Sequence, residues 1–185
     1  MRRADGNSMK NYLIVVDMQK DFVNGALGTP EACAIVPAVL KKVKDFQGEI
    51  IFTKDTHFED YLSTSEGRML PVEHCIKGTE GWQLVEELEG YCQENQCKVY
   101  EKLTFGCKEL AQDLLAIQHA EGIASIELIG LCTDICVVSN ALMIKAFLPE
   151  VTMKVDASCC AGVTPAKHAA ALETMQSCQI HVENK

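Results

Sequence analysis

Cys136 is the residue whose type and position point most directly to chemistry. It follows the apolar run Ile126–Leu131 and a polar Thr133-Asp134 step, a pattern that predicts a buried strand, a sharp turn and a helix with Cys136 in its first turn. The amino end of a helix carries free N–H groups and roughly half a positive charge, which lower the pKa of a thiol and favour the nucleophilic thiolate. Cys136 is therefore our candidate nucleophile, although free cysteines more often serve as small buried hydrophobic residues.

Three more polar side chains come directly after apolar runs of strand length: Asp17, Asp55 and Lys102. In a parallel sheet the carboxyl ends of the strands share one edge, where ligands bind, so we expect these side chains to meet Cys136 there. Each alone would be a solvated loop charge, but together they favour a site. Asp17 is our candidate base, because partial desolvation raises the pKa of a carboxylate toward neutrality. Lys102 would offset its charge, and backbone N–H groups of the turn before Cys136 would form an oxyanion hole.

Apolar runs of strand length alternate with segments of helical period along the chain. The predicted strands are Tyr12–Val16, Ile50–Thr53, Lys98–Tyr100, Ser125–Ile129, Thr152–Val155 and Gln179–Val182. The predicted helices are Ala32–Phe46, Cys107–His119, Asp134–Phe147 and Pro165–Met175, the last with Thr164 as its N-cap. This alternation predicts an α/β fold in which helices cover both faces of a mainly parallel sheet. The segment from Thr56 to Gly90 is irregular, with one short predicted helix at Trp82–Leu88, and long irregular segments are usually functional loops.

The composition fits one globular domain. A length of 185 residues allows a single core, and residues 1–8 are expected to form a flexible extension. A net charge of −9 argues against nucleic acid or an anionic membrane as partner, and no apolar run approaches the roughly 20 residues of a membrane span. The N-terminus lacks an apolar secretory core, and ten cysteines without a C-x2-C pair favour free thiols in a reducing cytoplasm. We also expect a homo-oligomer.

Three segments together resemble the isochorismatase-like cysteine hydrolases: Val15–Phe22, Tyr100–Phe105 and Gly130–Val137. The resemblance runs from Tyr12 to about Val182 and implies a three-layer α/β/α fold with a six-stranded sheet. It implies that Asp17 moves protons, that Lys102 is its charge partner, and that Cys136 forms a thioester with the substrate. It also implies a non-proline cis peptide at Leu131–Cys132, which turns the N–H groups of Cys132 and Cys136 toward an oxyanion.

A second pattern is similar to the nicotinamidase branch of that family. Asp55-x-His57 is followed by Pro71-x-x-His74-Cys and then Gly-Thr. Asp55, His57 and His74 are residue types that bind a divalent ion, with zinc expected first and manganese or iron as alternatives. Glu66 stands near the place where other members supply a further carboxylate. The resemblance therefore implies a metal site of Asp55, His57 and His74, with Glu66 either as a fourth ligand or as a hydrogen-bond partner of the ligands.

The expected substrate is a small amide. Some nicotinamidases place an aromatic residue just before the proline of the second histidine motif, where this chain has Leu70. Phe22 and Phe105 are candidates for contacting a substrate ring, with core packing as their alternative role. Nicotinamide hydrolysis is the leading hypothesis. A metal-free hydrolase of another small amide or of a carbamoyl or ureido compound is the alternative within the family, and a non-catalytic thiol-rich binding or redox protein is the alternative outside it. Isochorismatase activity is disfavoured because cleavage of a vinyl ether needs no thiol.

Overall fold

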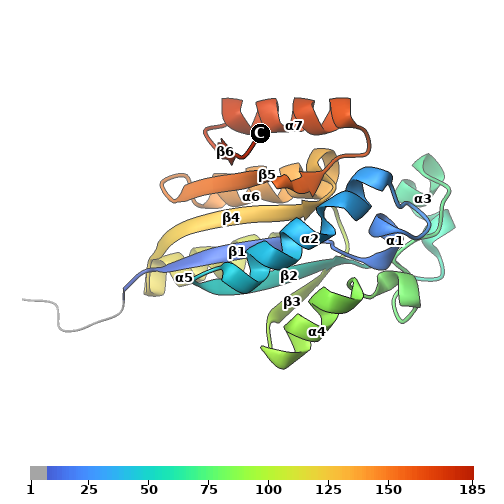
Figure 1. Cartoon of the computed structure of the whole chain (residues 1–185), viewed down its shortest axis with the longest axis horizontal. Coiled ribbons are helices and arrows are strands. Elements are labelled where there is room, and N and C mark those ends of the chain that lie inside the picture. Colours follow the sequence, from blue (N-terminus) through green and yellow to red (C-terminus); the bar gives the residue numbers. More distant parts are fainter. Residues whose placement is uncertain (1–7) are drawn as a thin grey trace, which may run out of the picture.

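The fold is built on one six-stranded sheet with the order β3-β2-β1-β4-β5-β6, in which every neighbouring pair is parallel (Figure 1). The structure is a computed structural model that describes residues 8–185, so most of the expected N-terminal extension lies outside the described residues. The strands are β1 (Lys10–Val16), β2 (Glu49–Asp55), β3 (Lys98–Lys102), β4 (Ile123–Leu131), β5 (Thr152–Ala161) and β6 (His181–Glu183). The predicted α/β class and the six strands are confirmed.

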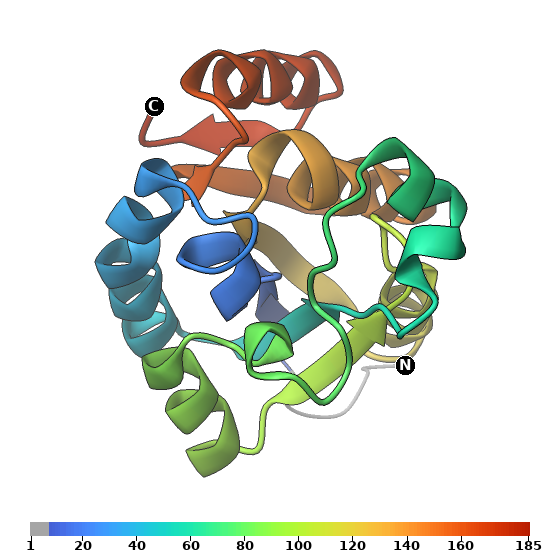
Figure 2. The same ribbon diagram turned by 90° about the vertical axis from the view of Figure 1, so that its right-hand side faces the viewer.

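Helices cover both faces of the sheet, as Figures 1 and 2 show. They are α1 (Lys20–Val23), α2 (Pro30–Asp45), α3 (Ser65–Met69), α4 (Glu86–Glu94), α5 (Lys108–Ala120), α6 (Val138–Phe147) and α7 (Pro165–Ser177). Strand β1 explains the layers, because its alternate side chains enter two different cores. Leu13 and Val15 pack with α2 and α4, whereas Ile14 and Val16 pack with α5, α6 and α7. None of the helices within residues 8–185 is long and apolar enough to cross a membrane.

Several element boundaries differ from the sequence-based prediction. Strand β5 continues to Ala161 instead of ending at Val155, because the polar residues that interrupt its apolar pattern have partners in the fold; Asp156, for example, accepts hydrogen bonds from Ser158. The predicted helix Asp134–Phe147 is a π-helical turn, η3 (Thr133–Val137), followed by α6. The helix predicted at Trp82–Leu88 begins only at Glu86, after the short 3-10 turn η2 (Glu80–Trp82). Helix α7 begins at Pro165 with Thr164 as N-cap, as predicted.

The carboxyl ends of the central strands form the edge on which the site lies. The strand order reverses between β1 and β4, which opens a crevice at this end of a parallel sheet. Gly130, near the end of β4, has a φ of +118°, and a Cβ there would lie 2.1 Å from the carbonyl oxygen of Val16. Only glycine allows the two strands to approach so closely. The segment between β2 and α4, with η1 (Tyr61–Ser63) and α3, lies over this edge in Figure 2.

Candidate active site

Lys102, at the end of β3, lies at the centre of the predicted catalytic residues. Its Nζ is 2.7 Å from Asp17 Oδ2, 3.2 Å from Cys136 Sγ and 3.2 Å from Asp55 Oδ1. All four side chains are buried, and Asp17 is 0% exposed. The parallel topology brings them together, because Asp17 follows β1, Asp55 and Lys102 end β2 and β3, and Cys136 follows β4. The structure therefore places the three predicted catalytic side chains in one buried group.

Asp17 is held in a fixed orientation by the neighbouring strand. Its carboxylate accepts a hydrogen bond of 2.7 Å from Thr53 Oγ1, and its N–H donates to the carbonyl of Thr53. Its φ of +48° lies in the left-handed region that residues other than glycine rarely adopt. Such conformations are enriched at functional sites. Asp17 is thus positioned by backbone and side-chain contacts before any substrate arrives.

Burial governs the protonation of this group. Burial, reinforced by the Asp17 carboxylate, raises the pKa of Cys136 well above its usual value, against the opposing effect of Lys102. The expectation that a helix end lowers the pKa of this thiol is therefore wrong, because desolvation of the buried sulfur outweighs it. Burial also raises the pKa of Asp17, although Lys102 acts to lower it. Burial would lower the pKa of Lys102, but Asp17, Cys136 and Asp55 hold it well above its usual value. A raised pKa favours the neutral form of the Cys136 thiol, and the Asp17 carboxylate is the buried group that could accept its proton.

The turn that carries Cys136 is fixed by its own hydrogen bonds. The carbonyl of Cys132 accepts the N–H groups of Ile135 and Val137 at 3.0 and 3.1 Å. The peptide bond Leu131–Cys132 is cis, as the resemblance implies. Asn140, fully buried on α6, donates 2.8 Å to the carbonyl of Cys136. The backbone around Cys132 and Cys136 is therefore ordered at the place predicted for the oxyanion hole.

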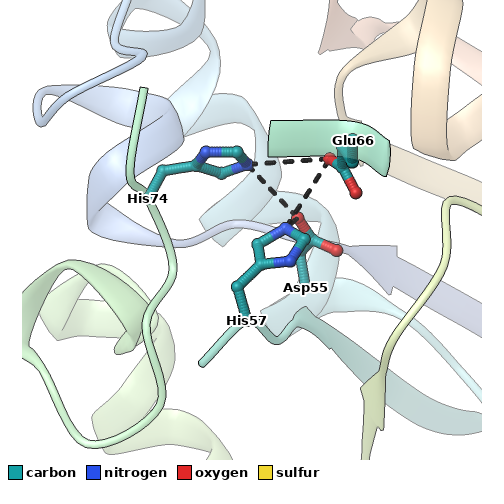
Figure 3. A group of neighbouring side chains, drawn as sticks. All are labelled: Asp55, His57, Glu66 and His74. Carbon is teal, nitrogen blue, oxygen red and sulfur yellow. Dashed lines mark hydrogen bonds and ion pairs between the residues drawn. The ribbon is translucent and has the colours of Figure 1, made fainter. Parts of the chain in front are cut away.

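Four side chains that could hold a metal ion converge (Figure 3), and one of them, Asp55, contacts Lys102. Nε2 of His57 lies 2.9 Å from Asp55 Oδ2 and 3.6 Å from Glu66 Oε1. Nε2 of His74 lies 3.6 Å from the same oxygen of Asp55 and 4.0 Å from Glu66 Oε1. The two rings and the two carboxylates point toward one another from β2, the residues after it, α3 and the loop that follows. All four predicted metal-binding residues thus lie in one group.

The geometry of this group fits one divalent ion. Ligand atoms about 2.1 Å from a tetrahedral zinc ion lie roughly 3.5 Å apart, and the four ligand atoms here all lie within 4.8 Å of one another. Nδ1 of His74 is 2.7 Å from the carbonyl of Val72, a contact that directs Nε2 into the group. Burial would raise the pKa of Asp55, but His57, His74 and Lys102 hold it well below its usual value. An ionised carboxylate with two imidazoles is a donor set suited to zinc, manganese or iron.

A cavity of about 710 Å³ joins the two groups. Cys136, Asp55, Glu66 and His74 all line it, and so do the three predicted substrate-binding residues, Phe22, Leu70 and Phe105. The Phe22 ring lies 5.5 Å from the His74 ring, whereas Leu70 and Phe105 are 40% and 45% exposed and stand at the outer wall. At position 70 the cavity wall is therefore formed by an aliphatic side chain instead of an aromatic ring.

Sequence reasoning missed three buried polar residues that support the site. Thr53 binds Asp17, Asn140 binds the carbonyl of Cys136, and Gln19 makes hydrogen bonds of 2.8 Å to both the N–H and the carbonyl of Asp55. Gln19 lies within the first motif, only two residues after Asp17, and this place in the motif could have identified it as a site residue. Thr53 and Asn140 stand inside a strand and a helix, where nothing in the local sequence marks them.

These features agree with comparisons to known proteins. Residues 11–184 match the isochorismatase domain, and the chain belongs to the isochorismatase family. The nicotinamidase/pyrazinamidase of Mycobacterium tuberculosis is 27% identical over 185 residues, an alignment that covers 92% of this chain and 96% of that protein. The crystal structure of nicotinamidase/pyrazinamidase PncA from Bacillus subtilis has a TM-score of 0.79 and 28% identity, with 95% of this chain and 100% of that chain covered. Pyrazinamidase of Pyrococcus horikoshii, solved in complex with zinc, has a TM-score of 0.74 and 28% identity, with 95% and 99% covered.

Proposed function

We propose that this protein hydrolyses nicotinamide to nicotinate and ammonia, with Cys136 as the nucleophile. One observation carries the proposal: Cys136, which contacts Lys102 in the first group, lines the same cavity as Asp55, Glu66 and His74 of the second group. The first group supplies amide hydrolysis, and the second suits a substrate with a ring nitrogen. Relatives named nicotinamidase and pyrazinamidase support the same assignment.

In the proposed reaction, Asp17 takes the thiol proton as Cys136 Sγ attacks the carboxamide carbon. The backbone N–H groups of Cys132 and Cys136 stabilise the oxyanion. Asp17 returns the proton to the departing amino group, which leaves as ammonia while an acyl thioester remains on Cys136. Asp17 then takes a proton from water, the resulting hydroxyl attacks the thioester, and the proton restores the thiol as nicotinate leaves. Lys102 keeps Asp17 oriented and balances its charge throughout.

We further propose that Asp55, His57, His74 and Glu66 hold one divalent ion. Zinc is the first candidate because the related pyrazinamidase was solved with zinc, and manganese and iron suit the same donors. When bound, the ion supplies a Lewis-acid contact for the ring nitrogen of the substrate. Phe22, Leu70 and Phe105 would then enclose the ring and orient its carboxamide toward Cys136. We infer from the ten free thiols that the protein works in a reducing compartment, the cytoplasm.

The test compares three amides of the same shape. Purified protein is incubated with nicotinamide, pyrazinamide or benzamide, and released ammonia is measured. Both ring-nitrogen amides should be cleaved, with kcat/KM for benzamide about 100-fold lower, because a site built for a polar contact rejects an analogue that lacks it. Equal rates for benzamide and nicotinamide would exclude the ring-nitrogen contact and favour the alternative of another small amide. No ammonia from any of the three would contradict the proposed function.

A further inference from the structure

The polar Thr133-Asp134 step before Cys136 has no role in the reaction described above, yet both residues are bound to another element. Thr133 is fully buried, and its Oγ1 lies 2.7 Å from Nδ1 of His168 on α7. Oδ1 of Asp134 accepts a hydrogen bond of 3.0 Å from the N–H of Val163, in the connection between β5 and α7. Two consecutive residues of η3 are therefore held by the segment Val163–His168.

That segment is itself rigid. Thr164 caps α7, because its Oγ1 accepts the N–H of Lys167 at 3.2 Å and its carbonyl accepts the N–H of His168 at 2.9 Å. The end of β5 packs closely against this first turn, since a Cβ on Gly162 would lie 2.7 Å from the backbone nitrogen of His168. The imidazole of His168 thus extends from a fixed backbone toward Thr133.

The ring of His168 suits a hydrogen bond with a hydroxyl. Burial lowers the pKa of His168, with Asp134 acting in the opposite direction, so the ring is neutral at neutral pH. A neutral imidazole offers one donor and one acceptor, and a threonine hydroxyl pairs with either. Removing His168 would leave the fully buried hydroxyl of Thr133 without this partner, and removing the hydroxyl would leave the half-buried ring of His168 without it.

We propose that His168 is a positioning residue for the hydrolysis, acting through Thr133 on the turn that carries Cys136. This inference rests on the proposed function. His168 need not touch the substrate, because its contact fixes the start of η3, and η3 sets both Cys136 Sγ and the backbone N–H groups of the oxyanion hole. A displacement of about 1 Å in such a group costs roughly 100-fold in rate.

The test uses four variants: His168→Ala, Thr133→Val, the double variant, and His168→Asn, whose shorter amide places a polar atom near the position of Nδ1. His168→Ala and Thr133→Val should each lower kcat for nicotinamide by about 10- to 100-fold, with KM changed by less than about twofold. The double variant should be no slower than the slower single variant, because both remove the same contact. His168→Asn should recover most of the activity. His119→Ala, on an exposed position of α5, is the matched control and should keep full activity.

Thermal unfolding of each variant separates loss of fold from loss of position. Loss of activity in the double variant equal to the product of the two single losses would overturn the proposal, and so would normal kcat in His168→Ala. If one of the alanine or valine variants does not fold, wild type, His168→Asn and His168→Gln are compared instead. His168→Gln should not keep the activity that His168→Asn keeps, because its amide is longer.

If wild type releases no ammonia from nicotinamide, the proposed function fails separately. The alkylation rate of Cys136, followed by mass spectrometry, then tests positioning: it should change several-fold in His168→Ala and recover in His168→Asn, and an unchanged rate would overturn the inference.

Discussion

In the proposed reaction, one proton passes between Asp17 and Cys136 within a buried group of side chains. Burial raises the pKa of both groups, which disfavours a thiolate formed in advance, so in the proposed reaction Asp17 accepts the proton as the thiol attacks. This differs from a cysteine whose thiolate is formed in advance at a helix end. The base is therefore as necessary as the nucleophile in the proposed reaction.

Asp17→Asn should lower kcat for nicotinamide by about 1,000-fold, because asparagine keeps the shape of the side chain but cannot take the thiol proton. Cys136→Ala should abolish activity. Ammonia release is the measurement, and circular dichroism checks the fold. Asp60→Asn, at an exposed position, is the matched control. Normal turnover by Asp17→Asn would show that another group moves the proton.

Protein purified without chelator should contain about one divalent ion per chain, measured by elemental analysis. His57→Ala and His74→Ala should lose the ion, because each removes one of only two imidazoles in the group. Glu66→Gln should weaken binding less, since Glu66 is the most exposed of the four and its oxygen lies farther from the histidines than that of Asp55. His119→Ala should retain the ion. A wild-type protein without metal, also after incubation with zinc, would contradict the assignment.

At the scale of elements, the position of the site follows from strand ends. The alternation of strands and helices was sufficient to predict that Asp17, Asp55, Lys102 and the turn before Cys136 share an edge, because parallel connections leave few other arrangements. Thr53 and Asn140 could not be predicted in this way, since both have partners distant in sequence: Thr53 contacts Asp17, and Asn140 Oδ1 accepts the N–H of Cys107. The conformation of the segment between β2 and α4 could not be predicted either, because its sequence has no periodic pattern. The motifs alone placed His57, Glu66 and His74 on it.

Gly130→Ala should destabilise the protein by about 2–4 kcal/mol, because a positive φ is strained for alanine and the new Cβ would meet the carbonyl of Val16. The relief of that contact would separate β1 from β4 and move Asp17 relative to Cys136, so activity should fall as well. Gly78→Ala is the matched control: its φ is +87°, but no atom lies within 4 Å of the added Cβ. It should cost only about 1 kcal/mol. Urea unfolding compares the two, and equal losses would contradict the close approach of the strands.

At the scale of the whole molecule, a buried ion cluster joins one helical layer to the sheet. Lys42 on α2 lies 2.8 Å from Glu127 on β4 and 2.8 Å from Asp156 on β5. Burial would raise the pKa of Asp156, but hydrogen bonds from Lys42, Ser158 and Asn184 lower it. Burial would likewise lower the pKa of Lys42, but the two carboxylates raise it. The pair of Lys42 and Asp156 therefore stabilises the fold at pH values at which Asp156 is ionised. The expected homo-oligomer stays a prediction.

Lys42→Met should destabilise the protein by about 1–3 kcal/mol at pH 7, because it leaves two buried carboxylates without their cation. A carboxylate with a lowered pKa in the folded state contributes stability above its unfolded pKa and loses it as the pH falls through the folded value. The difference between wild type and Lys42→Met should therefore narrow as the pH falls from about 5 toward 2. Urea midpoints across that range are the measurement, with Lys44→Met, an exposed position on the same helix, as control. A difference that does not change with pH would contradict the role of the carboxylates.

Lys102 is shared between the two halves of the site, since one ammonium contacts Asp17, Cys136 and Asp55. The catalytic group and the metal-binding group are therefore coupled, and neither evolution nor protein engineering could change one without affecting the other. A change of Asp55 intended only to alter metal choice would leave Lys102 with one carboxylate fewer and would alter the basicity of Asp17. Variation in substrate preference is less constrained at Leu70 and Phe105, which line the cavity and are 40% and 45% exposed. New substrates are thus most accessible through changes in the outer wall, with the ends of the strands left as they are.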